Sequence, residues 1–183
     1  MKIVVCIKQV PVTGAEKRYT DDLRLDRAGA EAIINPLDEY AIEQALRLVD
    51  SGAADSVTYL SMGPEQAAEA LRRALAMGGD DAVLITDPAL AGADEWATAL
   101  VLAAALDKLA PDVALMGMAS DDARGSLVPG AVAANVGMSI GTSVLEPGQD
   151  PATVLSEADH NMYLMKSNQP SRALGGEPPA TAS

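Results

Sequence analysis

Short apolar segments alternate with longer amphipathic ones along most of the chain. The first, Ile3–Ile7, is a continuous run rich in β-branched residues, which is typical of a strand buried on both faces. Further strands are expected at 57–60, 82–86 and 113–116, and helices at 35–49, 65–77, 94–109 and 126–135. Strands that alternate with helices of this length form βαβ units. The sequence therefore predicts an α/β fold with a mostly parallel sheet flanked by helices.

The composition limits the classes of partner. The chain has 183 residues, of which 49% are hydrophobic, and it contains no Phe. This length is enough for one domain with a buried core, which Ala, Leu and Val must fill. The formal net charge is −13, whereas nucleic acids and anionic membrane surfaces both require a basic surface. Neither is expected as a partner, and an anionic ligand would need local backbone donors.

Cysteine and histidine are almost absent. Cys6 is the only cysteine and His160 the only histidine, which excludes an internal disulfide, a multi-cysteine metal site and a histidine-rich one. We expect His160 to face solvent. The apolar start ends at Lys8, too early for a signal peptide, and the apolar run 100–106 is too short to span a bilayer. A reducing, cytoplasmic setting is the expectation.

Ligands of parallel α/β sheets bind beyond the carboxyl ends of the strands, at a topological switch point. The loops after the first, second and fourth strands and the turn at Asn35 are therefore candidate sites. The helix expected to begin at Gly125–Val128 would offer free N–H groups to a phosphate without a basic patch. Arg124 either adds charge there or is simply exposed. Asp121 and Asp122 either contact a ribose or cap the helix.

Two further residues at this edge allow two interpretations each. Cys6 is either a small buried apolar residue or part of a pocket wall. Asn35 is a helix N-cap followed by Pro, and its side chain could in addition face a ligand. The chain has no G-x-G-x-x-G motif after the first strand, no Walker loop and no credible Ser–His–acid set. We therefore expect no acid–base or nucleophilic catalyst.

Two other parts of the chain depart from this alternation of apolar and amphipathic segments. Residues 11–29 are polar and irregular, and we expect an excursion or small hairpin there. After Asn135 we expect a strand at 138–144 and an amphipathic helix at 152–166. Residues 168–183 are rich in Pro and Gly, and we expect them to be disordered.

The sequence resembles the β subunit of electron transfer flavoprotein, collinearly over about residues 1–134. The matching segments are 3–11, 25–27, 34–41, 61–64, 70–78, 92–94, 97–99 and 117–130, of which 61–64 with 70–78 is the most specific. The resemblance implies a Rossmann-like core that binds a structural AMP. It also implies an α subunit partner that holds most of the FAD, and dehydrogenases, of the acyl-CoA type or others, that supply electrons.

The resemblance also implies which residues bind the cofactor. Those expected to line the AMP pocket or to wrap the nucleotide are Cys6, Asn35, Pro36, Leu37, Asp38, Met62, Gly117, Met118, Ala119, Asp122, Gly125, Ser126, Leu127 and Val128. Ser126, Leu127 and Val128 would offer backbone N–H groups to the phosphate. Leu127 stands where the family often has Gln, so a side-chain hydrogen bond is missing while the backbone donors remain.

The end of the chain departs from that family, whose β subunits continue well beyond this point. Residues 136–167 resemble the last strand and helix of a GGDEF-type diguanylate cyclase domain, through residues 139–141, 155, 158–159 and 162–166. The cyclase signature itself is absent, so no cyclase chemistry is expected. We expect a truncated chimera with a nucleotide-binding domain at 1–135, a GGDEF-like segment at 136–167 and the tail at 168–183.

The functional expectation is an electron carrier subunit rather than an enzyme, with the chemistry carried by FAD. The alternative is a truncated or chimeric nucleotide-binding module without electron transfer. A cyclase-related signalling fragment is a third hypothesis, disfavoured by the missing site.

Overall fold

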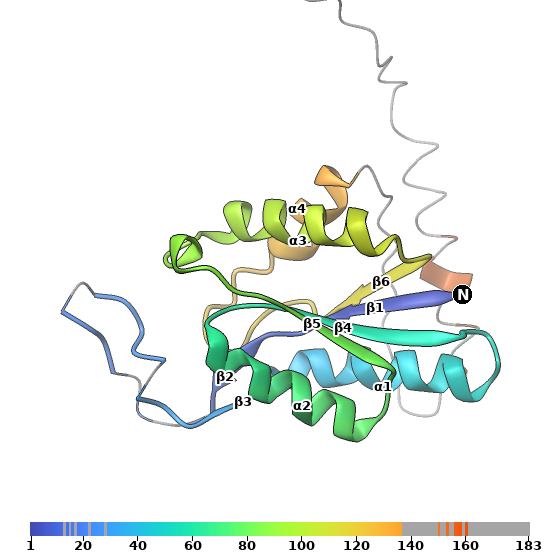
Figure 1. Ribbon diagram of the computed structural model, residues 1–183, viewed down its shortest axis with the longest axis horizontal. Helices are drawn as coiled ribbons and strands as arrows, with labels where there is room; N and C mark the ends of the chain where they lie inside the picture. The colour runs from blue at the N-terminus through green and yellow to red at the C-terminus, as the bar shows by residue number, and fades with distance from the viewer. Residues whose placement is uncertain are drawn as a thin grey trace, which may run out of the picture. The chain divides into compact units, whose positions relative to one another are not determined.

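The computed structural model describes residues 1–136 except 13, 15, 17, 22 and 28, together with 150, 153, 156–158 and 160. The chain divides into two units, Met1–Met138 and Ser139–Ser183, and the fold belongs to the first (Figure 1). Its strands are β1 (Lys2–Cys6), β2 (Gln9–Pro11), β3 (Ala32–Ile34), β4 (Ser56–Met62), β5 (Asp81–Ile85) and β6 (Val113–Met116). Its helices are α1 (Pro36–Asp50), α2 (Ala68–Met77), α3 (Glu95–Leu109) and α4 (Val128–Asn135), with short 3-10 helices η1 (Glu65–Ala67) and η2 (Pro88–Leu90).

The main sheet has 4 strands in the order β5-β4-β1-β6, and every pairing is parallel. Val4 of β1 lies opposite Thr58 of β4 on one side and Ala114 of β6 on the other. This confirms the predicted parallel α/β sheet. Because the chain moves from β1 to β4 and β5 on one side and then crosses to β6 on the other, the switch point lies between β1 and β6.

Helices cover both faces of the sheet: α1 and α2 lie below it and α3 and α4 above it in Figure 1. Val4 and Cys6 pack with Leu102 and Leu106 of α3 in one hydrophobic cluster. The neighbouring strand positions, such as Val5, point to the opposite face and are equally buried. This is why the first strand reads as a continuous apolar run.

Some helix ends differ from the sequence expectation. The segment 65–77 divides into η1 and α2, and its predicted glycine C-cap is found at Gly78, which has a φ of 143°. The helix predicted from Ser126 begins at Val128 instead, since Ser126 has a left-handed φ of 56°. Pro129 stands in the first turn of α4, where the missing N–H has no carbonyl to bond within the helix.

The polar excursion is confirmed as a hairpin. Strands β2 and β3 pair antiparallel, and beyond them the chain forms a second ladder with a bridge between Tyr19 and Leu25. Thr20 N–H donates to the Arg24 carbonyl over 2.8 Å, and Asp26 N–H donates to the Arg18 carbonyl over 2.9 Å. We call the described residues 18–21 and 23–27 the arm.

The predicted strand 138–144, most of the predicted helix 152–166 and the expected disorder of 168–183 lie outside the described residues. Thr153, Ser156–Ala158 and His160 are in helical conformation, and His160 is exposed as expected.

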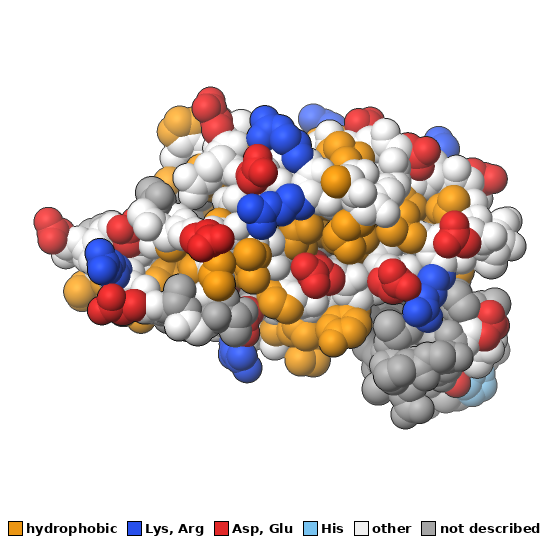
Figure 2. Space-filling model, turned by 90° about the horizontal axis from the view of Figure 1, so that it is seen from below, with side chains coloured by type: hydrophobic (Ala, Val, Ile, Leu, Met, Phe, Trp, Pro, Cys, Tyr) orange, Lys and Arg blue, Asp and Glu red, His pale blue; other side chains and the backbone are white. Residues whose placement is uncertain are grey.

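The surface view in Figure 2 shows acidic, basic and hydrophobic side chains interspersed, with no large basic area on this face. Within the part of the chain that the structure describes, no helix has the length and apolar character needed to cross a bilayer.

Candidate functional site

A cavity of about 1080 Å³ opens at the carboxyl ends of β1, β4 and β6. This is the edge at which the sequence placed the site, and the size suits a nucleotide-sized ligand, since ligand pockets typically measure about 300–1,000 Å³. Of the predicted site residues, those that line the cavity are Cys6, Asn35, Asp38, Met62, Gly117, Met118, Ala119, Gly125, Ser126 and Val128. Pro36, Leu37, Asp122 and Leu127 do not line it.

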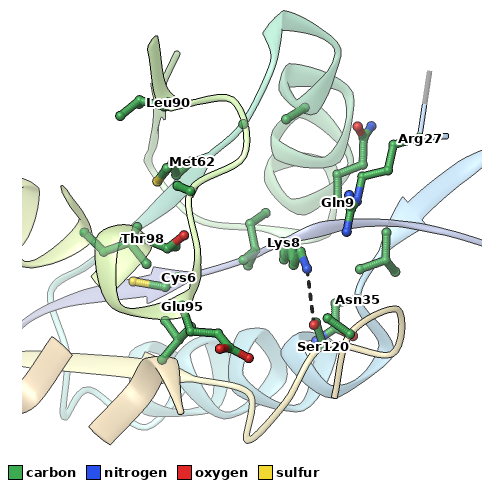
Figure 3. A pocket seen from close by; sticks show the side chains of 18 of the residues that line it. Cys6, Lys8, Gln9, Arg27, Asn35, Met62, Leu90, Glu95, Thr98 and Ser120 are labelled. Atoms are coloured by element: carbon green, nitrogen blue, oxygen red, sulfur yellow. Dashed lines mark hydrogen bonds between the residues drawn. The ribbon is translucent and has the colours of Figure 1, made fainter. Parts of the chain in front are cut away.

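The close view in Figure 3 shows two sides of this pocket. Cys6, Met62, Thr98 and Glu95 lie on one side, and Lys8, Ser120, Asn35 and Arg27 on the other. Burial, with a smaller effect from the nearby Asp38 carboxylate, raises the pKa of the Cys6 thiol to about 12. Cys6 is therefore a neutral thiol that is both buried and part of the pocket wall, which reconciles the two interpretations of its role.

Asn35 connects three segments around the switch point. It occupies the N-cap position of α1, but its side chain makes no cap hydrogen bond. Instead its Nδ2 donates to Asp38 and to the Ala119 carbonyl, both over 2.9 Å, and its Oδ1 accepts from the Asp121 N–H over 2.9 Å. The predicted N-cap position of Asn35 is confirmed, with Pro36 directly after it, but these buried partners occupy the side-chain amide in place of a cap hydrogen bond.

Asp38 is a buried carboxylate in the first turn of α1. Its Oδ2 accepts from the Lys8 N–H over 2.8 Å, and its Oδ1 accepts from Asn35. Burial raises the pKa of Asp38 to about 6, although hydrogen bonds from Asn35, Lys8 and Gly117 act in the opposite direction. The residue thus helps to fix the end of β1 against α1 and the loop that follows β6.

Asp122 forms the most complete ionic contact of the site. Its side chain is 2% exposed and accepts from Lys8 Nζ over 2.8 Å and from Arg27 Nη2 over 2.7 Å. Burial alone would raise its pKa, but the hydrogen bonds and charges of Lys8 and Arg27 outweigh burial and lower the pKa to about 2. Asp122 does not cap α4, so that alternative is wrong, and it is not among the residues that line the cavity. Its expected contact with a ribose stays a prediction.

Asp121 also fails to cap α4. Its N–H donates to Asn35, and its carboxylate accepts from Arg124 Nη2 over 2.7 Å. Arg124 is exposed, in line with one of its two interpretations, and has a left-handed φ of 53°.

The backbone at 126–128 is rich in unused donors. Among the described residues, the N–H groups of Ser126, Leu127 and Val128 have no hydrogen-bond partner. Ser126 and Val128 border the cavity. Left-handed conformations at Arg124 and Ser126 are unusual for residues with a side chain, and such strained backbone is often found at ligand sites. Donors of this kind at the start of a helix suit an anion.

Sequence reasoning missed three charged residues that shape the site: Lys8, Arg27 and Glu95. Lys8 lies two residues after the end of β1, so the rule that ligands bind at carboxyl ends could have found it. Glu95 is the first residue of α3, and its carboxylate lies where a Cβ on Gly125 would be. Nothing in the sequence indicates that Arg27, on a separate hairpin, reaches Asp122.

The side chains and backbone donors of the pocket are suited to binding a ligand. No group of three or more His, Cys, Asp or Glu residues in the described ranges could hold a metal ion. The pocket combines an apolar wall, a closed amide and carboxylate network and a set of backbone donors, which together can orient a nucleotide.

Known proteins share much of this sequence. The sequence profile of the electron transfer flavoprotein domain matches residues 22–172. Electron transfer flavoprotein subunit beta of Mycobacterium tuberculosis is 42% identical over 142 residues, which cover 74% of this chain and 53% of that protein. The subunit beta of Megasphaera elsdenii is 48% identical over 112 residues, covering 61% and 42%. The Caffeyl-CoA reductase-Etf complex subunit CarD of Acetobacterium woodii is 40% identical over 145 residues, covering 79% and 55%.

The chain spans about half the length of the curated relatives it matches. The profile match also runs through 136–167, the segment that resembles a GGDEF domain end, and that second resemblance stays a prediction. The extent of the profile match and the identity to these relatives show that the chain belongs to the electron transfer flavoprotein family.

Proposed function

We propose that the chain is an electron transfer flavoprotein β-like subunit that binds AMP in the pocket at the carboxyl ends of β1, β4 and β6. The single observation that carries this proposal is the set of partnerless N–H groups at Ser126–Val128, beside a pocket that Cys6 and Asn35 also line. A phosphate there would receive several hydrogen bonds at the start of α4. In a chain of net charge −13, local donors are what an anionic ligand needs.

The residues present fit an adenine nucleotide. Cys6, Met62 and Leu102 offer apolar surface for a base. The network around Asn35 and Asp38 fixes the wall between the base and the loop after β6, so little ordering remains to be done on binding. Leu37 would not contact the ligand. Its backbone packs against Gly117 and would hold the start of the loop after β6 in place.

The redox chemistry in this proposal belongs to FAD, which an α subunit would hold for the most part and which would exchange electrons with dehydrogenases. The pocket of this chain would hold AMP in a structural role. Its side chains would position the nucleotide and exclude water, which is the work of an electron carrier subunit rather than of an enzyme.

A second candidate is a truncated or chimeric nucleotide-binding module that does not transfer electrons. The observation in its favour is the resemblance of residues 136–167 to the end of a GGDEF-type domain. In this case AMP would bind as proposed, but no complex with an α subunit would form. The GGDEF-like segment at 136–167 would then be an addition without cyclase chemistry.

Two measurements test these functions in turn. Acid-denatured protein is assayed for released AMP by chromatography, and binding of AMP and adenosine to nucleotide-free protein is compared by calorimetry. AMP that binds more tightly than adenosine supports the role of the 126–128 donors, whereas equal affinities contradict it. The protein is then mixed with an α subunit and FAD. A yellow heterodimer on size exclusion supports electron transfer, and bound AMP without a heterodimer supports the second candidate.

A further inference from the structure

The buried carboxylate of Asp122 holds together segments that are far apart in the sequence. Lys8 approaches it from the end of β1, and Arg27 approaches it from the arm with Nε at 3.1 Å and Nη2 at 2.7 Å. Lys8 Nζ also donates to Ser120 over 3.2 Å, which adds a contact to the loop that carries Asp122 (Figure 3). One carboxylate thus joins the sheet, the arm and the loop after β6.

The arm lies along the mouth of the pocket. Arg24, Leu25 and Arg27 are among the residues that line the cavity. A Cβ built on Gly92 would lie 2.6 Å from Arg24 Nη1, so the arm reaches the loop that leads into α3. The Arg27 carbonyl accepts from Gln66 Nε2 over 3.3 Å. The arm therefore contacts segments on different sides of the opening.

The two partners of the Arg27–Asp122 pair differ in exposure. The Arg27 side chain is 43% exposed and that of Asp122 is 2% exposed. If Arg27 leaves, its guanidinium enters water, whereas Asp122 keeps the hydrogen bond from Lys8 and is not left as an unpaired buried charge. Opening of the arm therefore avoids the large penalty that normally accompanies a broken buried ion pair.

The arm is also built to move as a unit. Its ladder is closed by the Tyr19–Leu25 bridge and the hydrogen bonds between Thr20 and Arg24. Loss of the contact at Arg27 would leave these internal bonds intact. A hairpin with its own internal bonds can open without unfolding when the contacts that hold it to the pocket, the Arg27–Asp122 pair foremost among them, are broken.

We propose that Asp122 is a positioning residue that latches the arm over the mouth of the pocket through Arg27, so that the nucleotide enters and leaves when this pair opens. The identity of the ligand rests on the proposed function; the latch itself does not. Asp122 acts on the ligand through the arm and the loop rather than by touching it.

The test uses the full chain loaded with radiolabelled AMP and chased with unlabelled AMP. The variant Arg27→Met removes the latch on the arm and leaves Asp122 with Lys8. We expect it to release and take up AMP about tenfold faster, the scale of one charge-assisted hydrogen-bonded pair. Salt should accelerate release from the wild type but not from Arg27→Met, because screening weakens only the intact pair. A merely structural role would not produce this difference in salt response.

The matched control is Glu16→Gln, which breaks the fully exposed Arg18–Glu16 pair on the neighbouring stretch of the hairpin. It should keep the wild-type release rate. A wild-type rate in Arg27→Met, or an equal acceleration in Glu16→Gln, would overturn the latch.

A second readout needs no ligand. Tryptic cleavage after Arg24, whose guanidinium lies against Gly92 while the arm is closed, reports how often the arm opens. It should be faster in Arg27→Met and in Asp122→Asn than in the wild type and Glu16→Gln. If the wild type binds no AMP, the proposed function fails while this cleavage still decides the latch. Equal cleavage rates in all four proteins would refute it.

Discussion

Two glycines border the pocket at opposite ends of the loop after β6, and they face very different surroundings. A Cβ on Gly117 would lie 2.8 Å from the carbonyl carbon of Leu37, which is backbone at the start of α1. A Cβ on Gly125 would meet only the carboxylate and side chain of Glu95. One end of the loop is therefore fixed against backbone, whereas the other rests on a side chain that can move.

The hydrogen bonds follow the same division. At the Gly117 end, the polar groups of Asn35 and Asp38 are partnered within the protein. At the Gly125 end, Glu95 has no hydrogen-bond or ion-pair partner among the described residues, and the adjacent N–H groups are unused. The fixed side defines the pocket before a ligand arrives, and the adaptable side is where a ligand's charge has most influence.

The largest expected effect is on the fixed side. Asn35→Ala removes the partner of the Ala119 carbonyl, the Asp121 N–H and the Asp38 carboxylate, all at the buried switch point. Each unsatisfied buried group costs about 1–3 kcal/mol, so the free energy of unfolding should fall by about 4 kcal/mol in urea denaturation.

The matched control is another buried amide. Gln44 lies within α1, and neither of its side-chain polar atoms has a partner in the described part of the chain. Gln44→Leu should leave the free energy of unfolding unchanged or raise it, because no hydrogen bond is lost. A cost for Gln44→Leu equal to that of Asn35→Ala would mean that the loss at Asn35 reports packing instead of its hydrogen bonds.

Gly117→Ala should lower the free energy of unfolding by about 3 kcal/mol, since an added methyl group would force α1 and the loop apart at a backbone contact. It should also weaken AMP binding, because the displaced loop carries the 126–128 donors. Thermal denaturation and calorimetry on the same preparation measure both. Full stability in this variant would show that the loop is free to shift and that the division between fixed and adaptable ends is wrong.

The raised pKa of Asp38 predicts a pH dependence of stability. With a folded-state pKa of about 6 against an ordinary 3.8, the folded protein holds this proton more tightly than the unfolded chain. The contribution of Asp38 is therefore complete below about pH 4 and is lost as the pH rises through 6, by on the order of 3 kcal/mol. Asp122 has the opposite effect on stability, because its folded-state pKa is lowered to about 2. Its contribution is present above about pH 4 and is lost as the pH falls toward 2.

Urea denaturation between pH 4 and 7 of the wild type and Asp38→Asn isolates this contribution. The stability of the wild type relative to the variant should decline across the window. Parallel profiles would show that Asp38 titrates normally.

The strands and helices that position the site could be predicted from the sequence, but the side-chain hydrogen bonds and ion pairs within the site could not. Ile3–Ile7 could be assigned because a strand buried on both faces leaves a continuous apolar signal, and the segment 113–116 because it is a short apolar run, although β6 is only half-buried at the edge of the sheet. The partners of Asn35 and Asp122 could not be predicted, since they depend on loops that approach only after the sheet is assembled. Local rules correctly placed Asn35 at the N-cap position of α1, but they also offered a cap role for Asp121 and Asp122, whose carboxylates bind cations instead.

On the adaptable side, substitution of Glu95 should change the affinity for AMP more than the free energy of unfolding. Glu95→Gln removes a negative charge beside Gly125 and near the loop that carries the 126–128 donors. AMP affinity should rise about threefold, as expected for loss of a partly solvated repulsion. Adenosine is the matched control ligand, because it lacks the phosphate and its affinity should not change. Equal gains for both ligands would place Glu95 near the base and not near the phosphate.

The smallest expected effect is at Gly125 itself. Gly125→Ala introduces a methyl group where the Glu95 carboxylate lies, but that carboxylate is the far end of a flexible side chain and can rotate away. The free energy of unfolding should fall by less than about 1 kcal/mol, well below the cost of Gly117→Ala. In the double variant with Glu95→Ala even this cost should disappear, because the space is then empty and the two substitutions are coupled. A large loss that persists in the double variant would mean that the backbone at 124–126 is held as firmly as the Gly117 end, and the contrast between the two ends would no longer stand.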